Sequence, residues 1–246
     1  MIKLILILVI FPIAIAAQEM TPIQTDRPDQ TETPAIVPKG MFQMENGFSY
    51  EQVNAKASSL VTPSSLIKFG VNDHFEFRLI LEFVSEKEFG IKTSGLSPVL
   101  VGFKTRLAEE KGIIPLTSFI AHLSVPDLAS TEFKTDYYAP EFRFTMQHTL
   151  TDKVSLGYNL GAEWNGETPE PTFIYTLTTG ISLSQKTGCY IELYGFAPQK
   201  DKSDHRCDAG FTHLLSDDMM VDVSGGVGLT ENAPDYYAAL GFSFRL

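Results

Sequence analysis

The chain ends in YYAALGFSFRL, residues 236–246, and this short stretch carries the pattern that decides the fold. Every second residue from Tyr236 to Leu246 is apolar or aromatic, whereas the residues between them are mostly small or polar. Successive side chains of a β-strand point to opposite faces. The segment is therefore predicted to form a two-faced strand, apolar on one side and polar or small on the other.

The same alternation recurs in eleven further segments. In one of them Phe75, Phe77 and Leu79 alternate with Glu76 and Arg78. The predicted strands lie near residues 42–50, 67–71, 75–83, 99–107, 119–125, 142–150, 154–164, 173–183, 189–193, 206–215, 219–229 and 236–246. Their apolar faces contain no Asp, Glu, Lys or Arg. A charged side chain facing lipid at mid-bilayer would cost about 2–4 kcal/mol, so this absence is typical of a surface that faces hydrocarbon.

The connections between these segments alternate in length. Tight turns are predicted at Asn72, Glu109, Asp152, Lys186 and Asp217, and longer loops at 52–65, 84–97, 126–139, 165–171, 197–205 and 230–235. Five tight turns and six longer loops fit twelve strands with both termini on the periplasmic side. The predicted fold is all-β: a transmembrane antiparallel up-and-down β-barrel of about 12 strands over residues 41–246. An exported β-sandwich also alternates, but aromatic residues recur near the strand ends, as interfacial girdles require.

The first residues resemble a secretory signal. Lys3 precedes an apolar run from Leu4 to Ala16, and small residues around Ala17 offer a cleavage site. The alternative is a membrane-anchoring helix, but the run is shorter than the ~20 residues that such a helix needs. We therefore expect residues 1–17 to be a cleaved signal peptide, and the mature chain to reach the outer membrane of a Gram-negative bacterium.

Charge and chemistry-bearing residues exclude several function classes. The chain has 30 acidic and 19 basic residues, a net charge of −11, which argues against nucleic-acid binding. Cys189 and Cys207 fall at opposite ends of neighbouring strands, too far apart for a disulfide, so two free thiols are predicted. The five histidines lack metal-ligand spacing, and we expect neither metal nor cofactor. No nucleophile motif is evident, so an enzyme is not expected; a membrane-embedded esterase is the remaining enzymatic alternative.

Charged residues gather on the faces opposite the apolar ones. The lumen-lining candidates are Lys68, Glu76, Arg78, Glu82, Lys104, Arg106, Glu141, Arg143, Glu192, Asp208 and Asp222. A twelve-stranded barrel is intermediate between a filled interior and an open channel, so these charges either line a narrow pore or cross it as ion pairs. One interpretation is a network that only fixes strand register. The other is that the bases on the second to sixth predicted strands form an electropositive strip that orients anionic solutes.

Residues 18–40 precede the first predicted strand. Four prolines (Pro22, Pro28, Pro34 and Pro38) predict an extended rather than helical segment. The segment is either a loose periplasmic leader or a plug in the lumen. Its charged residues, the possible plug contacts, are Asp26, Arg27, Asp29 and Glu32.

Several motifs resemble those of a bacterial outer-membrane family known for the MetA pathway of phenol degradation. They are residues 24–32 (QTDRPDQTE), 69–79 (FGVNDHFEFRL), 102–104 (GFK) and 125–126 (VP). The resemblance covers nearly the whole exported chain and implies uptake of small, often aromatic or hydrophobic, molecules. The closing residues 242–246 (FSFRL) also resemble the terminal signal that barrel-assembly machinery reads, although Leu246 stands where an aromatic residue is commoner.

Together these observations predict a passive outer-membrane channel or transporter for small solutes. The alternative is a structural or surface-interaction barrel that transports nothing. The expected partners are outer-membrane lipid and lipopolysaccharide, the barrel-assembly machinery at the C-terminal strand, and a small-molecule solute. A monomer is expected, because a closed barrel has no free strand edge to pair.

Overall fold

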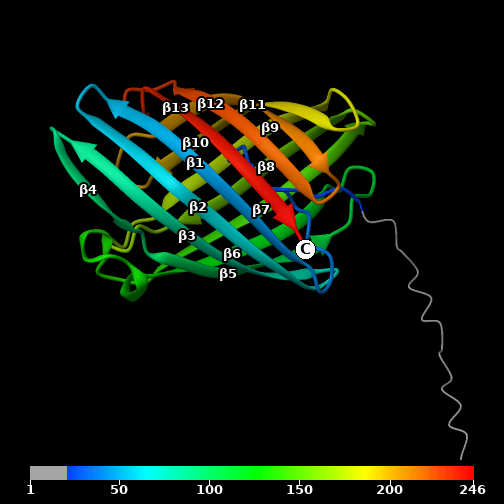
Figure 1. The fold of residues 1–246 in the computed structure, drawn as a ribbon, viewed down its shortest axis with the longest axis horizontal. Helices are drawn as coiled ribbons and strands as arrows, with labels where there is room; N and C mark the ends of the chain where they lie inside the picture. Colours follow the sequence, from blue (N-terminus) through cyan, green and yellow to red (C-terminus); the bar gives the residue numbers. More distant parts are fainter. Residues whose placement is uncertain (1–20) are drawn as a thin grey trace, which may run out of the picture.

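Twelve antiparallel strands close into a barrel in the computed structural model, which describes residues 21–246 (Figure 1). The expected signal peptide, residues 1–17, and the first three residues of the leader lie outside the described residues. The strands are β1 (Phe42–Asn54), β2 (Ala57–Asn72), β3 (Phe75–Glu88), β4 (Ile91–Leu96), β5 (Val99–Ala108), β6 (Leu116–Val125), β7 (Ala139–Thr151), β8 (Val154–Glu163), β9 (Thr172–Ser182), β10 (Thr187–Pro198), β11 (Asp204–Ser216), β12 (Met219–Gly228) and β13 (Tyr236–Arg245). Strands that are neighbours in sequence pair, except that β3 pairs with both β4 and β5, and β13 returns to β1 to complete the ring. No helix of the described residues is long and apolar enough to cross a membrane.

The alternation in the sequence becomes the two faces of this barrel. Phe77 and Leu240 point outward and are 57% and 60% exposed, whereas Glu76 and Ser243 point inward and are 0% exposed. The apolar residues therefore form an outer belt, and the polar ones fill the interior. The predicted fold class, an antiparallel barrel of about twelve strands, is confirmed.

The first and last strands meet at a seam beside both ends of the described chain. Gln43 of β1 lies opposite Arg245 of β13 in the ladder. Phe42 and Leu246 exchange backbone hydrogen bonds of 2.9 and 2.8 Å. Arg245 donates to the carbonyl of Thr21 at 2.9 Å, so the C-terminus marked in Figure 1 lies beside the first described residue. We call this rim the turn end, because the tight turns lie here, and the opposite rim the loop end.

The thirteenth strand arises because one wall strand is broken in two. β3 pairs first with β4, from Phe83 opposite Leu96 to Glu88 opposite Ile91, and then with β5 from Phe75 to Ile80. Pro98 lies at the break and has no N–H to donate to the ladder. The predicted loop at 84–97 is therefore wrong: this segment is a hairpin that continues the wall.

The predicted loop at 52–65 is also wrong, because β1 runs to Asn54 and β2 starts at Ala57. This part of β2 is rich in serine and has no apolar face, so the sequence pattern does not show it as a strand. Backbone hydrogen bonds nevertheless continue the ladder, and Ser58 pairs with Gln52 across the hairpin. The hairpins β1–β2 and β3–β4 therefore extend the barrel wall at the loop end.

The loop from residue 126 to 138 leans on the broken strand. It contains two short 3-10 turns, η1 (Pro126–Leu128) and η2 (Thr131–Phe133), and Ser130 donates its N–H to Leu96 at 2.9 Å. Hydrogen bonds from Lys134 and then Tyr138 hold the pKa of Asp127, in this loop, below its ordinary value. Ser130 and Phe133 thus cover the end of β4 at Gly95 and Leu96.

Candidate functional site: the barrel lumen and the segment inside it

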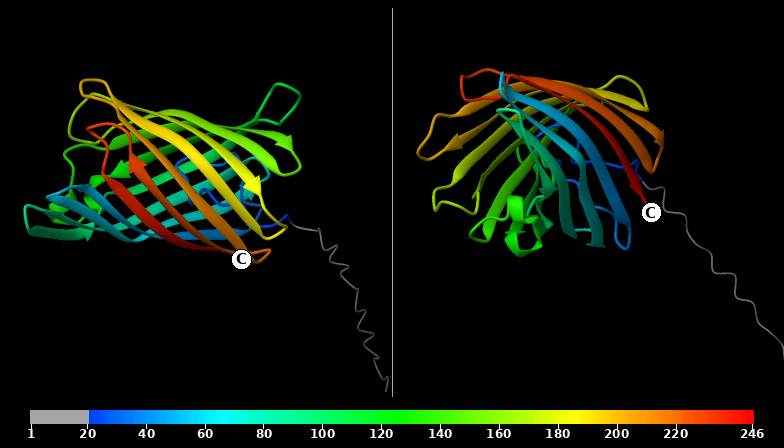
Figure 2. Two further views of the ribbon diagram at one scale, coloured as in Figure 1. Left: turned by 90° about the horizontal axis from the view of Figure 1, so that it is seen from above. Right: turned by 60° about the vertical axis from the view of Figure 1, so that its left-hand side comes forward.

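Residues 21–37 lie inside the barrel. They form hydrogen bonds or ion pairs with eleven of the twelve wall strands: β1, β2, β3, β5, β6, β7, β8, β9, β10, β12 and β13. A segment that touches side chains all around a closed ring can only lie within it, and Figure 2 shows its dark blue trace between the walls. We call residues 21–37 the luminal segment.

Asp26 is the main anchor of the luminal segment. Its carboxylate binds Lys68 of β2 at 3.0 Å, Arg78 of β3 at 2.8 Å and Lys104 of β5 at 2.7 Å. Asp26 is 5% exposed and Lys104 is 0% exposed. Buried ions need partners, and removing one partner leaves an uncompensated charge, so these contacts hold Asp26 firmly against this wall. Its backbone N–H also donates to Glu45 of β1 at 2.9 Å.

Further contacts tie the segment to the same half of the barrel. Glu32 pairs with Arg78 at 2.5 Å. The N–H of Val37 donates to Glu76 at 2.7 Å, and Ser118 of β6 donates to the carbonyl of Pro34 at 2.7 Å. On the next strands, Arg143 donates to the carbonyl of Gln30, and Asn159 both donates to and accepts from the backbone of Glu32. The segment is held here by charge as well as by its backbone.

Arg27 occupies a slot in the seam between β1 and β13. Gly47 and Gly241 lie opposite each other in the ladder. A Cβ at Gly47 would lie 2.1 Å from the Arg27 guanidinium, and one at Gly241 would lie 2.6 Å from Arg27 Nε. The guanidinium donates to Asp222 of β12 at 3.1 Å and to the carbonyl of Leu240 at 3.2 Å. Two glycines in register thus make the room that this side chain needs.

Replacing Gly47 with alanine should loosen the luminal segment, because the new methyl group and the Arg27 guanidinium cannot share the slot. We expect faster hydrogen exchange at the amides of residues 24–33, measured by mass spectrometry in detergent. Gly180→Ala is the matched control, since a Cβ there would meet only the Ser155 hydroxyl. Equal exchange rates in both variants would contradict the slot.

On the opposite wall, formed by β10 and β11, the luminal segment contacts carboxylates and no basic side chain. Glu192 of β10 and Asp208 of β11 lie opposite each other in the ladder. Glu192 accepts hydrogen bonds from the N–H of Gln30 at 2.8 Å and from the hydroxyl of Thr31 at 2.5 Å. Asp208 accepts from the hydroxyls of two tyrosines, Tyr190 and Tyr237. The other oxygen of Asp208, Oδ1, is buried and has no hydrogen-bond partner among the described residues.

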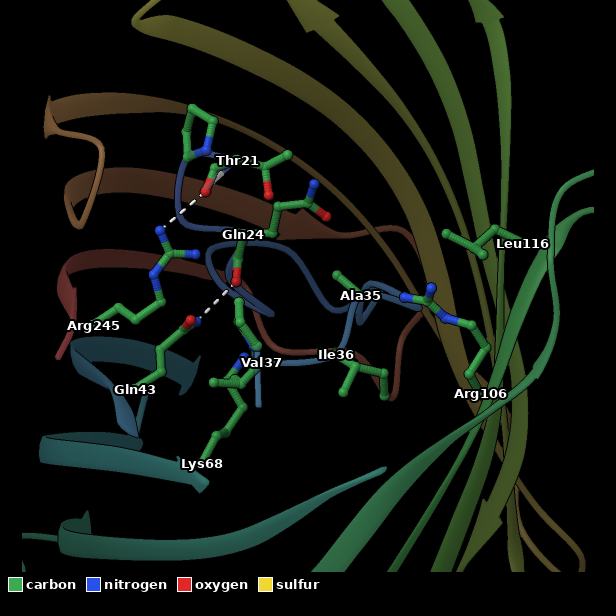
Figure 3. Close-up of a pocket in the computed structure, with 12 residues that line it drawn as sticks. Thr21, Gln24, Ala35, Ile36, Val37, Gln43, Lys68, Arg106, Leu116 and Arg245 are labelled. Carbon is green, nitrogen blue, oxygen red and sulfur yellow. Dashed lines mark hydrogen bonds between the residues drawn. The ribbon is translucent and has the colours of Figure 1, made fainter. Parts of the chain in front are cut away.

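Cavities remain on both sides of the segment. At the loop end, one of about 260 Å³ is lined by Tyr194, Tyr237, Arg206 and Glu82. At the turn end lie cavities of about 280 and 170 Å³. Figure 3 shows the smaller one, with Arg106 and Leu116 facing Gln43 and Arg245 across the luminal segment. The lumen is therefore closed in its middle and open toward each end.

The predicted lumen and plug residues are either buried or half-buried. Lys68, Glu76, Arg78, Lys104, Arg143, Glu192, Asp208, Asp222 and Asp26 are buried, and Glu82, Arg106, Glu141, Arg27, Asp29 and Glu32 are half-buried. The structure brings Asp26 together with three of the predicted bases, and Arg143 with Glu141 at 2.8 Å. Arg106 lies apart and pairs with Glu109 at 3.1 Å. Acidic side chains thus balance the predicted electropositive strip in this closed state, and its effect on anions stays a prediction.

The interior also holds uncharged residues that were not among the candidates. Asn159, Thr145 and Ser118 are 0% exposed, and Tyr190 and Tyr194 line the cavities beside Glu192. Their position in the alternation could have identified them, because each lies on the face of its strand opposite the predicted apolar face. Cys189 and Cys207 are both free, and each faces an apolar residue, Phe211 and Leu193, across the β10–β11 ladder. No group of residues in 21–246 has the arrangement of a metal site.

Comparison with known proteins identifies a matching family and several solved structures with a similar fold. A family model described as "Putative MetA-pathway of phenol degradation" matches residues 25–246. The structure is similar to that of an outer membrane channel from Pseudomonas putida F1, with 14% identity, a TM-score of 0.69, and 89% of this chain and 99% of that chain covered. It is also similar to the NanC porin (9% identity, TM-score 0.55, 83% and 100% covered) and to the KdgM porin solved with disordered oligogalacturonate (10%, 0.56, 82% and 98%). At these identities the likeness concerns the fold. No curated protein matches the chain.

Proposed function

The chain belongs to the family described by the MetA-pathway of phenol degradation, and from that premise we propose that it is a channel for passive uptake of small solutes. We place it in the outer membrane of a Gram-negative bacterium. The observation that carries the proposal is the barrel itself, with a charge-free apolar exterior and a polar interior that has cavities at both ends. A polar interior with a cavity at each end is the arrangement that a channel requires.

The luminal segment supports a gated channel rather than an open pore. Asp26, Arg27 and Glu32 form ion pairs with the wall and close the middle of the lumen. We propose that residues 18–40 act as a plug, that the lumen-lining candidates border the solute path, and that solutes pass only when part of the plug moves. The described state is then the closed one.

The remaining parts of the chain fit the same proposal. Residues 1–17 would be removed on export, and the outer belt would contact lipid and lipopolysaccharide. The closing strand β13 would carry the signal for the barrel-assembly machinery. The closed ring leaves no long free strand edge, which supports a monomer. We propose no enzymatic activity.

The family description favours small aromatic solutes, and the lumen favours solutes with polar groups. A cavity of about 260 Å³ lined by Tyr194, Tyr237 and Arg206 has room for one aromatic ring with a polar substituent. We therefore propose small polar aromatic compounds as the first solutes to test.

The test is swelling of liposomes that contain the refolded mature protein, with a panel of sugars, amino acids, small aromatic acids and small uncharged aromatic compounds. We expect swelling rates above those of protein-free liposomes for the smallest solutes, and faster swelling with uncharged aromatic compounds than with sugars of similar mass. Impermeability to every solute, in the wild type and in a variant whose plug is released, would favour a purely structural barrel.

A further inference from the structure

The luminal segment is anchored unequally on its two sides. Toward β2, β3 and β5, Asp26 and Glu32 form four ion pairs with Lys68, Arg78 and Lys104. Toward β10 and β11, residues 29–31 present Asp29 and two hydrogen-bond donors to a pair of carboxylates. Like charges close together oppose binding, whereas buried opposite charges hold it. The segment is therefore held most weakly where it faces β10 and β11.

The carboxylates on that side lack a counter-charge. Glu192 and Asp208 face each other directly across the ladder, are 1% and 5% exposed, and form no ion pair with any residue of 21–246. Their partners are Gln30, Thr31 and the tyrosine hydroxyls, and Asp208 Oδ1 has none. Directly opposed like charges are unfavourable in a sheet, and buried charges are normally paired. A cation at this place would relieve both.

The nearest bases are already engaged. Arg206, at the loop end, binds Glu51 at 2.7 Å and also pairs with Asp204. Arg27 binds Asp222, the next inward acid along the wall. The excess of acid on β10–β12 therefore persists after every ion pair of the described chain is counted.

The cavities of the two ends approach each other along this wall. Tyr190, Glu192 and Tyr194 are alternate residues on the inner face of β10. Tyr190 lines the 280 Å³ cavity at the turn end, and Tyr194 lines the 260 Å³ cavity at the loop end. Four residues of a strand span about 13 Å, so Glu192, midway between the two tyrosines, and the residues covering it form the barrier between the cavities. Along β2 the corresponding position is blocked by Lys68, which Asp26 and Glu45 hold by ion pairs.

We infer that solutes pass along the inner face of β10–β12, past Glu192 and Asp208, and that this path prefers cations over anions. The inference rests on the proposed channel function and adds the route and charge preference to it. Residues 29–31 move away from β10 first, because only hydrogen bonds hold them there, and release of Asp26 from the opposite wall then frees the rest of the luminal segment. The exposed carboxylates then attract cations, and the faces of Tyr190 and Tyr194 add cation–π attraction for organic ammonium groups.

The test measures reversal potentials in planar bilayers under a tenfold KCl gradient. It uses the full-length mature chain, as wild type and with Asp26→Asn, a substitution that weakens the hold on the plug. The test variant is Glu192→Gln with Asp208→Asn. The control is Glu167→Gln with Glu231→Gln, which removes the same number of acids from exposed positions in two loops.

We expect a potassium-to-chloride permeability ratio above one that falls at least about threefold in the β10/β11 variant and stays constant in the control. Chloride preference, an unchanged ratio in the β10/β11 variant, or an equal fall in the control would overturn the inference. Absence of any conductance in both wild type and Asp26→Asn would instead contradict the channel function, and the inference with it. Heat-modifiable migration on gels shows whether each variant folds. If the double variant does not fold, the permeability ratio is measured with Glu192→Gln alone.

Discussion

Deleting residues 21–38 raises the single-channel conductance by at least about tenfold, because this segment fills the middle of the lumen and nothing else in the described chain replaces it. With the segment gone, the cavities at the two ends join. The inner charges of the wall then face water, where their desolvation cost disappears. Conductance in planar bilayers is the measurement, with the mature full-length chain as reference.

The control for this deletion replaces residues 21–38 with a glycine–serine stretch of equal length. It keeps a tether at the N-terminus but removes the contacts of Asp26, Arg27 and Glu32. Both chains should conduct alike. A deletion chain that folds, judged by heat-modifiable migration, and conducts no better than wild type would show that the segment is not the barrier.

Asp26→Asn should raise the equilibrium constant for release of the plug about a hundredfold. The substitution preserves shape but removes the charge that faces Lys68, Arg78 and Lys104 together. Lys68 keeps Glu45, but Lys104 keeps only the carbonyls of Thr33 and Ala35. Breaking a buried ion pair from one side costs about 3 kcal/mol, and every 1.4 kcal/mol is tenfold.

The matched control is the same substitution three residues further on. Asp29 belongs to the part of the segment that faces Glu192 and Asp208, so Asp29→Asn removes a repulsion. We expect the open probability to rise with Asp26→Asn and to stay equal or fall with Asp29→Asn. Hydrogen exchange at residues 24–33 should change in the same directions. Equal responses of the two variants would contradict the unequal anchoring.

The outer face of the fold could be predicted from the sequence because every second residue of a membrane-spanning strand faces lipid and has to be apolar. Phe77 and Leu240 lie where the parity of their segments places them. The hairpins at 54–57 and 88–91 could not be predicted from the alternation. The strand ends that form them lie beyond the apolar belt, and strands outside lipid need no apolar face. The serines of β2 and the charged tip of β3 therefore read as loops, although their backbone hydrogen bonds continue the sheet.

The interior could be predicted only in part. Parity identifies which charges point inward, and the excess of acid on the last strands is visible in Glu192, Asp208 and Asp222. The partners are not visible, since the luminal segment has no periodicity and three prolines in residues 24–38 interrupt it. That Asp26 meets three bases from three strands follows from the path of the segment, which local sequence does not encode.

The seam has a consequence for biogenesis. The slot for Arg27 needs both Gly47 of β1 and Gly241 of β13, and Arg245 donates to the carbonyl of Thr21 at 2.9 Å. The Arg27 slot does not exist until the first strand meets the last. A half-assembled barrel can therefore hold the luminal segment only through its other anchors, such as Asp26, and pairing of the first and last strands during biogenesis also completes the seat of the segment.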